Sequence, residues 1–140
     1  MTVCIDTNVV LGMFGRNGPW LPIRQALMDR RLVWAVTTEI LLEYEEIAAR
    51  EMGRAATAQL LRFIDLLEQT RSNVRHVSPT FRFQLITADP DDNKFTDCAI
   101  AAEADWMISD DGHFTPLAEA GYKPKPITPA QFIARFLSGR

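Results

Sequence analysis

The sequence has few cysteines and no long apolar run. Its two cysteines among 140 residues, Cys4 and Cys98, do not have the spacing of a metal-binding motif. No stretch approaches the roughly 18 apolar residues that a transmembrane helix needs, and Asp6 interrupts the N-terminal apolar residues too early for a signal peptide. We therefore expect a cytoplasmic protein with no membrane contact, in which both thiols are buried as small hydrophobic residues.

The sequence also has no internal repeat, no low-complexity tract, no linker and no excess of positive charge. Its length suits one domain, 1–140, and its net charge is −3, which argues against binding to nucleic acid by overall charge neutralisation. The charges are unevenly distributed. Residues 89–111 contain eight acids and one base, Lys94, whereas residues 50–82 contain six arginines and three acids. This distribution suits a metal site that acts on a polyanion, and it also suits an ordinary surface.

Hydrophobic patterning predicts alternating strands and helices. Continuous apolar runs indicate short buried strands, and the spacing of Leu60, Phe63, Ile64 and Leu67 indicates an amphipathic helix. The expected strands are 3–5, 32–36, 74–77, 106–108 and 125–127, and the expected helices are 9–14, 19–30, 37–50, 54–69, 92–104 and 129–137, with a break at Gly53. The order predicts an α/β fold: a three-layer α/β/α sandwich with a central parallel sheet of about five strands.

Acidic residues follow two of the expected strands. Asp6 comes directly after the first strand and Asp111 shortly after 106–108, so both carboxylates should meet at the carboxyl edge of the sheet. Glu43 lies in the helix after the second strand, and Asp92 and Asp97 lie in the helix before 106–108. Carboxylates brought together from distant segments are the ligands that Mg²⁺ prefers, and such an ion can activate water and neutralise a phosphodiester.

Each acid also has an ordinary structural interpretation. Asp6 and Asp111 suit turns, Asp92 suits a helix N-cap, and Glu43 suits a solvated helix face. Asp97 follows Asp92 by five residues, or roughly 140° around a helix, so both can face one site only if the helix begins after Asp92. The sequence pattern therefore leaves the third carboxylate open between these two residues.

Five segments together resemble the PIN-domain family, in particular the branch of toxin components of toxin–antitoxin systems. They occur in the family's order over nearly the whole chain: IDTNV at 5–9, TTEILLEYEEI at 37–47, DPDDNKFTDCAIA at 89–101, ADWMISDDGHF at 104–114 and ITPAQF at 127–132. The resemblance implies a ribonuclease dependent on Mg²⁺ or Mn²⁺ that cleaves single-stranded RNA, in which a water held by the metal attacks the phosphodiester. It also implies a homodimer and a cognate antitoxin protein.

The resemblance assigns roles to particular residues. Its four acids correspond to Asp6, Glu43, Asp92 and Asp111; Asp97 is an extra acid or a rival for the third place, for which the resemblance favours Asp92. The expected metal ligands are Asp6, Asp92, Asp97 and Asp111. Either Glu43 or Asp92 is expected to orient the attacking water. The expected substrate-binding or orienting residues are Asn8, Ser109 and His113, the last standing where many relatives have another acid.

Two other functions are compatible with acids at strand ends. One is a different Mg²⁺-dependent phosphoryl-transfer enzyme or a receiver-like signalling domain, although Asp6-Thr7-Asn8 lacks the Asp-x-Asp pattern of the phosphatases. The other is a non-catalytic binding protein with merely solvated acids. The nuclease hypothesis predicts that a divalent ion stabilises the protein, whereas a non-catalytic binding protein should show no such stabilisation.

Overall fold

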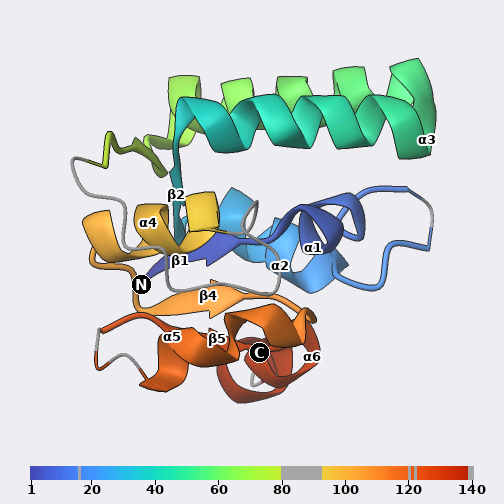
Figure 1. Cartoon of the computed structure of the whole chain (residues 1–140). Helices are drawn as coiled ribbons and strands as arrows, with labels where there is room; N and C mark the ends of the chain where they lie inside the picture. Colours follow the sequence, from blue (N-terminus) through green and yellow to red (C-terminus); the bar gives the residue numbers. More distant parts are fainter. Residues whose placement is uncertain (16, 80–92, 120, 122, 139–140) are drawn as a thin grey trace.

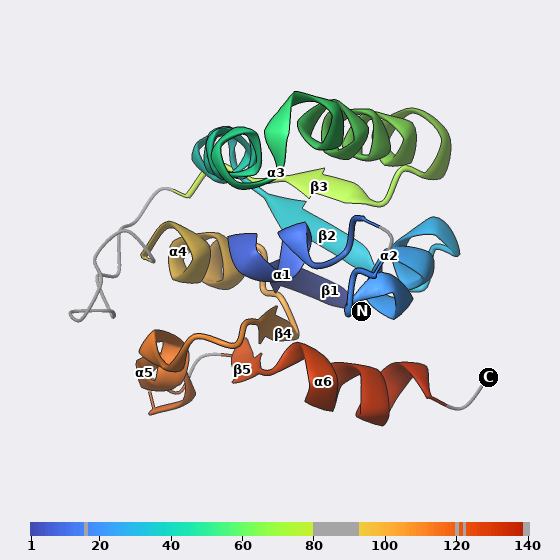
Figure 2. The same ribbon diagram turned by 90° about the vertical axis from the view of Figure 1, so that its right-hand side faces the viewer.

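The centre of the molecule is a five-stranded, all-parallel sheet in the order β3-β2-β1-β4-β5 (Figures 1 and 2; all five strands are labelled in Figure 2). The computed structural model describes residues 1–15, 17–79, 93–119, 121 and 123–138, and only the backbone of His113. The strands are β1 (Thr2–Ile5), β2 (Val33–Val36), β3 (Val74–His76), β4 (Trp106–Ile108) and β5 (Lys125–Ile127). The expected α/β fold with helices flanking a parallel sheet is therefore confirmed.

The central strand β1 shows why short apolar runs form this sheet. Val3, Cys4 and Ile5 are all fully buried, because neighbouring strands pair with both edges of β1 and helices cover the sheet. Ile5 is aligned with Ile108 of β4, so the two strands end at the same level. Residues that follow β1 and β4 are thus brought side by side at the carboxyl edge.

The helices connect the strands and carry most of the remaining chain. In the described part of the chain, none of them is both long and apolar enough to cross a membrane. They are α1 (Thr7–Leu11), α2 (Leu21–Met28), α3 (Thr38–Leu66), α4 (Asn93–Ala101), α5 (Thr115–Glu119) and α6 (Pro129–Phe132), with π-helical turns η1 (Leu67–Arg71) and η4 (Ile133–Leu137) and a 3₁₀ turn η3 (Gly112–Phe114).

Most expected elements are present, with different ends. The capping box that starts the last helix is formed: the Thr128 hydroxyl accepts from the backbone of Gln131, whose side chain accepts from the backbone of Thr128. The helical segments η3 and α5 were not expected, because three and five residues are too few to show a helical period in sequence. The sequence of 78–91, which includes Asp89-Pro90-Asp91, predicts a loop, and this segment lies mostly outside the described residues.

The aromatic residues of α3 and α4 join these helices to the sheet in one core. The Tyr44 hydroxyl donates to the carbonyl of Ile5 at 2.5 Å, and its ring lies 5.7 Å from that of Trp34 and 6.3 Å from that of Phe95. Burial raises the pKa of Tyr44 well above its usual value, so the hydroxyl stays a donor. This core fixes the start of α3 and the start of α4 relative to the end of β1.

Both cysteines belong to the same core. Cys4 and Cys98 are free thiols with no exposed surface, and their sulfur atoms lie 3.6 Å apart. The thiol–thiol hydrogen bond and burial together raise the pKa of Cys4 well above its usual value, so the protonated thiol is favoured. The expectation of two buried, apolar-like thiols is confirmed.

Gly53 divides α3 into two halves, and the second half runs back beside the first (Figures 1 and 2). Its φ of 88° and ψ of 177° lie in a region that residues with a Cβ rarely adopt. The break expected from the sequence is thus a reversal of the chain. Thr57 secures it by donating from its hydroxyl to the Gly53 carbonyl at 2.8 Å.

We expect Gly53→Ala to lower the free energy of unfolding by about 1–3 kcal/mol, because alanine is strained at this φ although its Cβ would meet open space. Urea denaturation measures the change. Gly112→Ala is the matched control, since Gly112 also has open space but no left-handed φ. Equal stability of both variants would contradict the strain argument.

Candidate metal centre

Asp6 lies where β1 ends and α1 begins. Its backbone amide donates to the carbonyl of Ile108 at 3.0 Å, which ties it to the end of β4. Its backbone is extended, and its Oδ1 accepts from the Thr7 amide at 2.8 Å as the N-cap of α1. The strand end and the helix start therefore both fix this carboxylate.

Ser109 connects Asp6 with Asp111. The Ser109 hydroxyl donates to Asp6 Oδ2 at 2.8 Å and accepts from the backbone amide of Asp111, also at 2.8 Å. Ser109 is buried, Asp6 is 7% exposed and Asp111 is partly buried. The two acids expected at the strand ends thus share one hydrogen-bonding partner, so they lie in the same surroundings.

Glu43 joins this cluster from α3. Its Oε2 accepts from the Thr7 hydroxyl, and its Oε1 lies 2.5 Å from the Lys94 ammonium group of α4. Because the Thr7 amide also binds Asp6, Thr7 links the two carboxylates. The result is a network that runs from β4 through β1 and α1 to α3 and α4.

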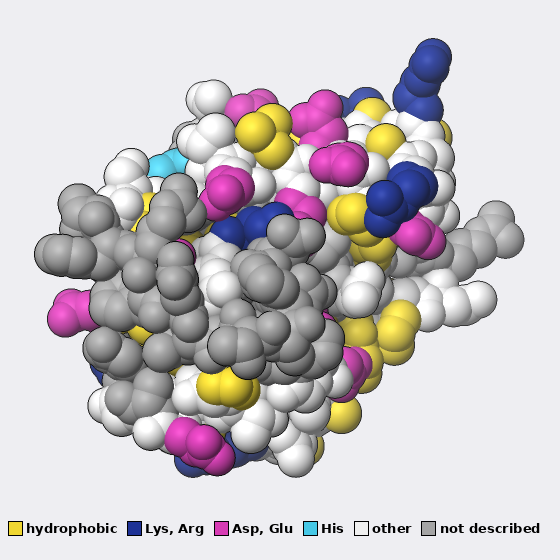
Figure 3. All heavy atoms as spheres, in the orientation of Figure 1, with side chains coloured by type: hydrophobic (Ala, Val, Ile, Leu, Met, Phe, Trp, Pro, Cys, Tyr) yellow, Lys and Arg dark blue, Asp and Glu magenta, His cyan; other side chains and the backbone are white. Residues whose placement is uncertain are grey.

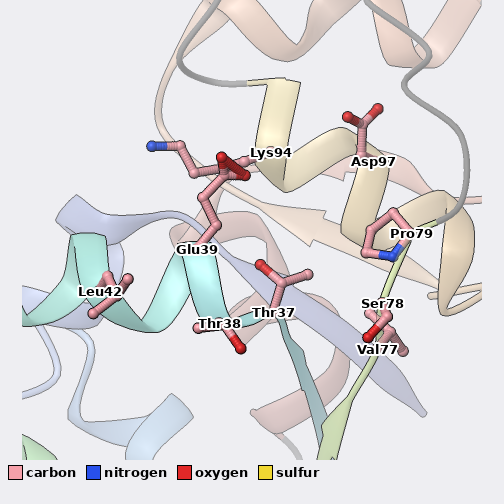
Figure 4. Close-up of a pocket in the computed structure, with 9 residues that line it drawn as sticks. All are labelled: Thr37, Thr38, Glu39, Leu42, Val77, Ser78, Pro79, Lys94 and Asp97. Atoms are coloured by element: carbon pink, nitrogen blue, oxygen red, sulfur yellow. The ribbon is translucent and has the colours of Figure 1, made fainter.

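Asp97 lies on α4, one helical turn after Lys94, and is only 3% exposed. Both residues line a cavity of about 470 Å³ at the carboxyl ends of β2 and β3 (Figure 4). In Figure 4 the side chain of Lys94 extends past Glu39, away from Asp97. The cavity is lined by hydroxyl, apolar and charged side chains, among them Thr37, Thr38, Glu39 and Val77.

The carboxyl of Asp6 is held in an environment that disfavours its charge. Burial raises its pKa above the usual value, hydrogen bonds from Ser109 and Thr7 lower it, and the charges of Asp111 and Glu43 raise it again, with a net upward shift. The hydrogen bonds through Ser109 and Thr7 hold Asp111 and Glu43 near enough to Asp6 for this repulsion. A cation at this position would favour the ionised form of every acid around it.

Of the three other residues expected at the site, Asn8, Asp92 and His113, the structure describes the side chain of Asn8 alone. Asn8 follows Thr7 in α1 and is exposed. Asp92 lies outside the described residues, and of His113 only the backbone is placed, in η3. Lys94 was not expected at the site. Lys94 did leave a signal, because it is the only base among eight acids at 89–111.

The arginine-rich segment 50–82 is only partly available to a ligand. Arg71 donates from Nε to the Met28 carbonyl at 3.1 Å, and Arg75 donates to the carbonyl of Ala102 at 3.0 Å. These two side chains therefore connect elements of the fold. Figure 3 shows Asp and Glu side chains among apolar and some basic ones over α3, so this face carries both signs of charge.

The donor set is suited to a hard divalent cation. Asp6 and Asp111 offer carboxylate oxygens from adjacent strand ends, with Asp97 on the neighbouring helix. Among the described residues, no three acids, histidines or cysteines lie close enough together to hold a metal ion between them. Mg²⁺ commonly binds through one or two carboxylates and keeps several waters, so the residues present fit such an ion.

Fold and site together define an α/β protein with an acidic site at the carboxyl edge of a parallel sheet. The sequence model of the PIN domain matches residues 2–113, and the chain belongs to this family. The family resemblance read from the sequence is thereby confirmed.

A solved structure shows the same fold. It is a chain from the crystal structure of VapBC2 from Rickettsia felis bound to a DNA fragment from their promoter, with 11% sequence identity and a TM-score of 0.59. The match covers 91% of this chain and 98% of that one. No curated protein matches the chain in sequence.

Proposed function

We propose that this PIN domain is a metal-dependent endoribonuclease that cleaves single-stranded RNA. The observation that carries the proposal is the hydrogen-bonded arrangement of Asp6, Ser109 and Asp111 at the ends of the adjacent strands β1 and β4. The raised pKa of Asp6 supports it, because an acid cluster that disfavours its own charge is stabilised by a cation. Membership of the PIN family gives the proposal its chemistry.

The acids take different roles in this proposal. Asp6 and Asp111 hold Mg²⁺ or Mn²⁺, with Asp92 and Asp97 as the candidates for a third ligand, and Ser109 fixes the orientation of Asp6. When bound, such an ion neutralises the charge of the phosphodiester and lowers the pKa of water. Glu43, held by Thr7 and Lys94, is placed to orient the attacking water. Asp97 is supported as the third ligand by its burial in the cavity next to Lys94.

The substrate follows from the surroundings of the site. The cavity that Asp97 and Lys94 line is large enough for part of a nucleotide. Asn8 is exposed at the start of α1, two residues after Asp6, and His113 follows Asp111 by two residues in η3; we assign both to contacts with the RNA. Phosphate contacts of this kind position the RNA without reading its sequence.

The biological setting we propose is a toxin–antitoxin pair, in which this chain is the toxin and forms a homodimer that a cognate antitoxin protein binds. The shared fold with a chain of VapBC2 supports this setting. Co-expression with the product of a neighbouring reading frame, followed by co-purification, tests the partner.

The nuclease activity is tested with single-stranded RNA and the purified chain. We expect cleavage in millimolar Mg²⁺ or Mn²⁺, none in EDTA, and restoration when the metal is added back. Asp111→Asn should lower the cleavage rate by about 10²–10³-fold, because it removes one charged ligand. Glu119→Gln, an exposed acid of α5, is the control for lost charge and contaminating nuclease.

Cleavage that persists in EDTA, or that is the same for Asp111→Asn and wild type, would refute the proposal. In that case the acidic cluster would have a structural or binding role.

A further inference from the structure

The ion pair between Lys94 and Glu43 lies inside the acidic site. The Lys94 Nζ and Glu43 Oε1 atoms are 2.5 Å apart, and the two side chains are only 16% and 21% exposed. A pair this sheltered is less screened than one on the surface, so its partners hold each other in place. The second oxygen of Glu43 accepts from the Thr7 hydroxyl, so both oxygens of this carboxylate are engaged.

The pair connects the two parts of the site. Through Thr7, Glu43 is linked to Asp6, and through α4, Lys94 is fixed one turn from Asp97. Phe95, which directly follows Lys94 in α4, is fully buried, which fixes the helix that carries Lys94. The ammonium group therefore occupies a fixed position among the acids.

A fixed ammonium group changes the charge that the site must still neutralise. Clustered carboxylates repel one another until cations compensate them, and two divalent ions are one way to supply the charge. Here one carboxylate, Glu43, is already compensated by a side chain of the protein. It is also held in an orientation set by two hydrogen-bond donors, which opposes its use as a metal ligand.

We propose that Lys94 is a positioning residue that takes the place of a second metal ion: it holds Glu43 as a non-ligand carboxylate, and the site consequently binds one divalent ion per chain. This inference rests on the proposed function only in assuming that the site binds a metal. It adds the number of ions and the residue that sets that number.

The test counts bound Mn²⁺ per chain by electron paramagnetic resonance of the free ion, without RNA, on the full-length protein. We expect one ion for wild type and two for Lys94→Met, because methionine keeps the apolar stem but frees Glu43 and returns one negative charge. Lys94→Arg should bind one ion, since it keeps the charge. Lys94→Met combined with Glu43→Gln should also bind one, because the freed carboxylate is gone.

Each outcome decides the matter. Two ions in wild type, or one ion in Lys94→Met, would overturn the inference, even if RNA cleavage follows the proposed metal dependence. Binding of no Mn²⁺ by wild type would overturn it as well, and the RNA assay then judges the nuclease proposal separately. A folding control comes from circular dichroism of each variant without metal. A second ion that appears in Lys94→Met and disappears with Glu43→Gln would establish the role of the pair.

Discussion

Replacing Asp6 with asparagine is expected to abolish metal-dependent stabilisation and to lower RNA cleavage by on the order of 10³-fold. Asp6 is the acid with contacts to both parts of the site: its two oxygens accept from Ser109 and Thr7, and it interacts with the charges of Asp111 and Glu43. Asparagine has nearly the same shape but cannot supply the charge. Melting with and without Mn²⁺, together with the RNA assay, measures both effects.

The expected size of the metal effect follows from binding linkage. At a free Mn²⁺ concentration about 100-fold above its Kd, wild type should gain about 2.7 kcal/mol of stability, and Asp6→Asn should gain almost none. Glu46→Gln, an exposed acid of α3, is the control and should keep the full gain. An undiminished gain in Asp6→Asn would remove Asp6 from the metal site.

Without metal, the same substitution should change how the stability of the protein depends on pH. Folding raises the pKa of Asp6. At pH values between the pKa of the unfolded state and that of the folded state, the folded protein therefore binds more protons than the unfolded protein. Its stability consequently falls as the pH rises through this interval. Above that interval the ionised carboxylate is a cost that asparagine does not carry. Metal-free Asp6→Asn should therefore lose less stability than wild type as the pH rises through this interval, which melting at several pH values measures.

The part of the site that the sequence predicts depends on strand ends. Asp6 and Asp111 follow β1 and β4, and the carboxyl ends of parallel strands necessarily share one edge of the sheet. The Ser109 hydrogen bonds now join these acids, and Ser109 itself was expected to orient one of them. The sheet was predictable for a related reason, because continuous apolar runs separated by helices favour a buried parallel arrangement.

The contacts between α3 and α4 were not predictable in this way. Whether Lys94 reaches Glu43 depends on how two helices lie against each other across 51 residues of sequence. Spacing along one helix contains no such information. The reversal at Gly53 is an intermediate case: a glycine within a helical pattern predicts a break, but the direction of the returning helix is set by the core residues that it buries, such as Leu60 and Phe63.

The core therefore determines part of the chemistry, and Phe95 is the residue at which this dependence is best tested. Its ring is fully buried, 6.3 Å from the Tyr44 ring and 6.2 Å from the Phe114 ring in an edge-on arrangement. Phe95→Ala should lower the free energy of unfolding by about 3–5 kcal/mol, because it removes a large buried side chain and leaves a cavity. That is a large share of the roughly 5–15 kcal/mol that stabilises a typical domain.

Urea denaturation of Phe95→Ala measures this loss, and Phe95→Leu keeps the measurement possible if the alanine variant does not fold. Leucine retains most of the apolar volume and should cost less than about 1.5 kcal/mol. Leu42→Ala is the surface control, since Leu42 is 62% exposed and its truncation should change stability by no more than about 0.5 kcal/mol. Phe95 lies between Lys94 and Asp97 on α4, so Phe95→Leu should also weaken Mn²⁺ binding while leaving every carboxylate in the chain. Unchanged metal affinity in a measurably destabilised Phe95→Leu would show that the position of α4 is set by contacts other than this ring.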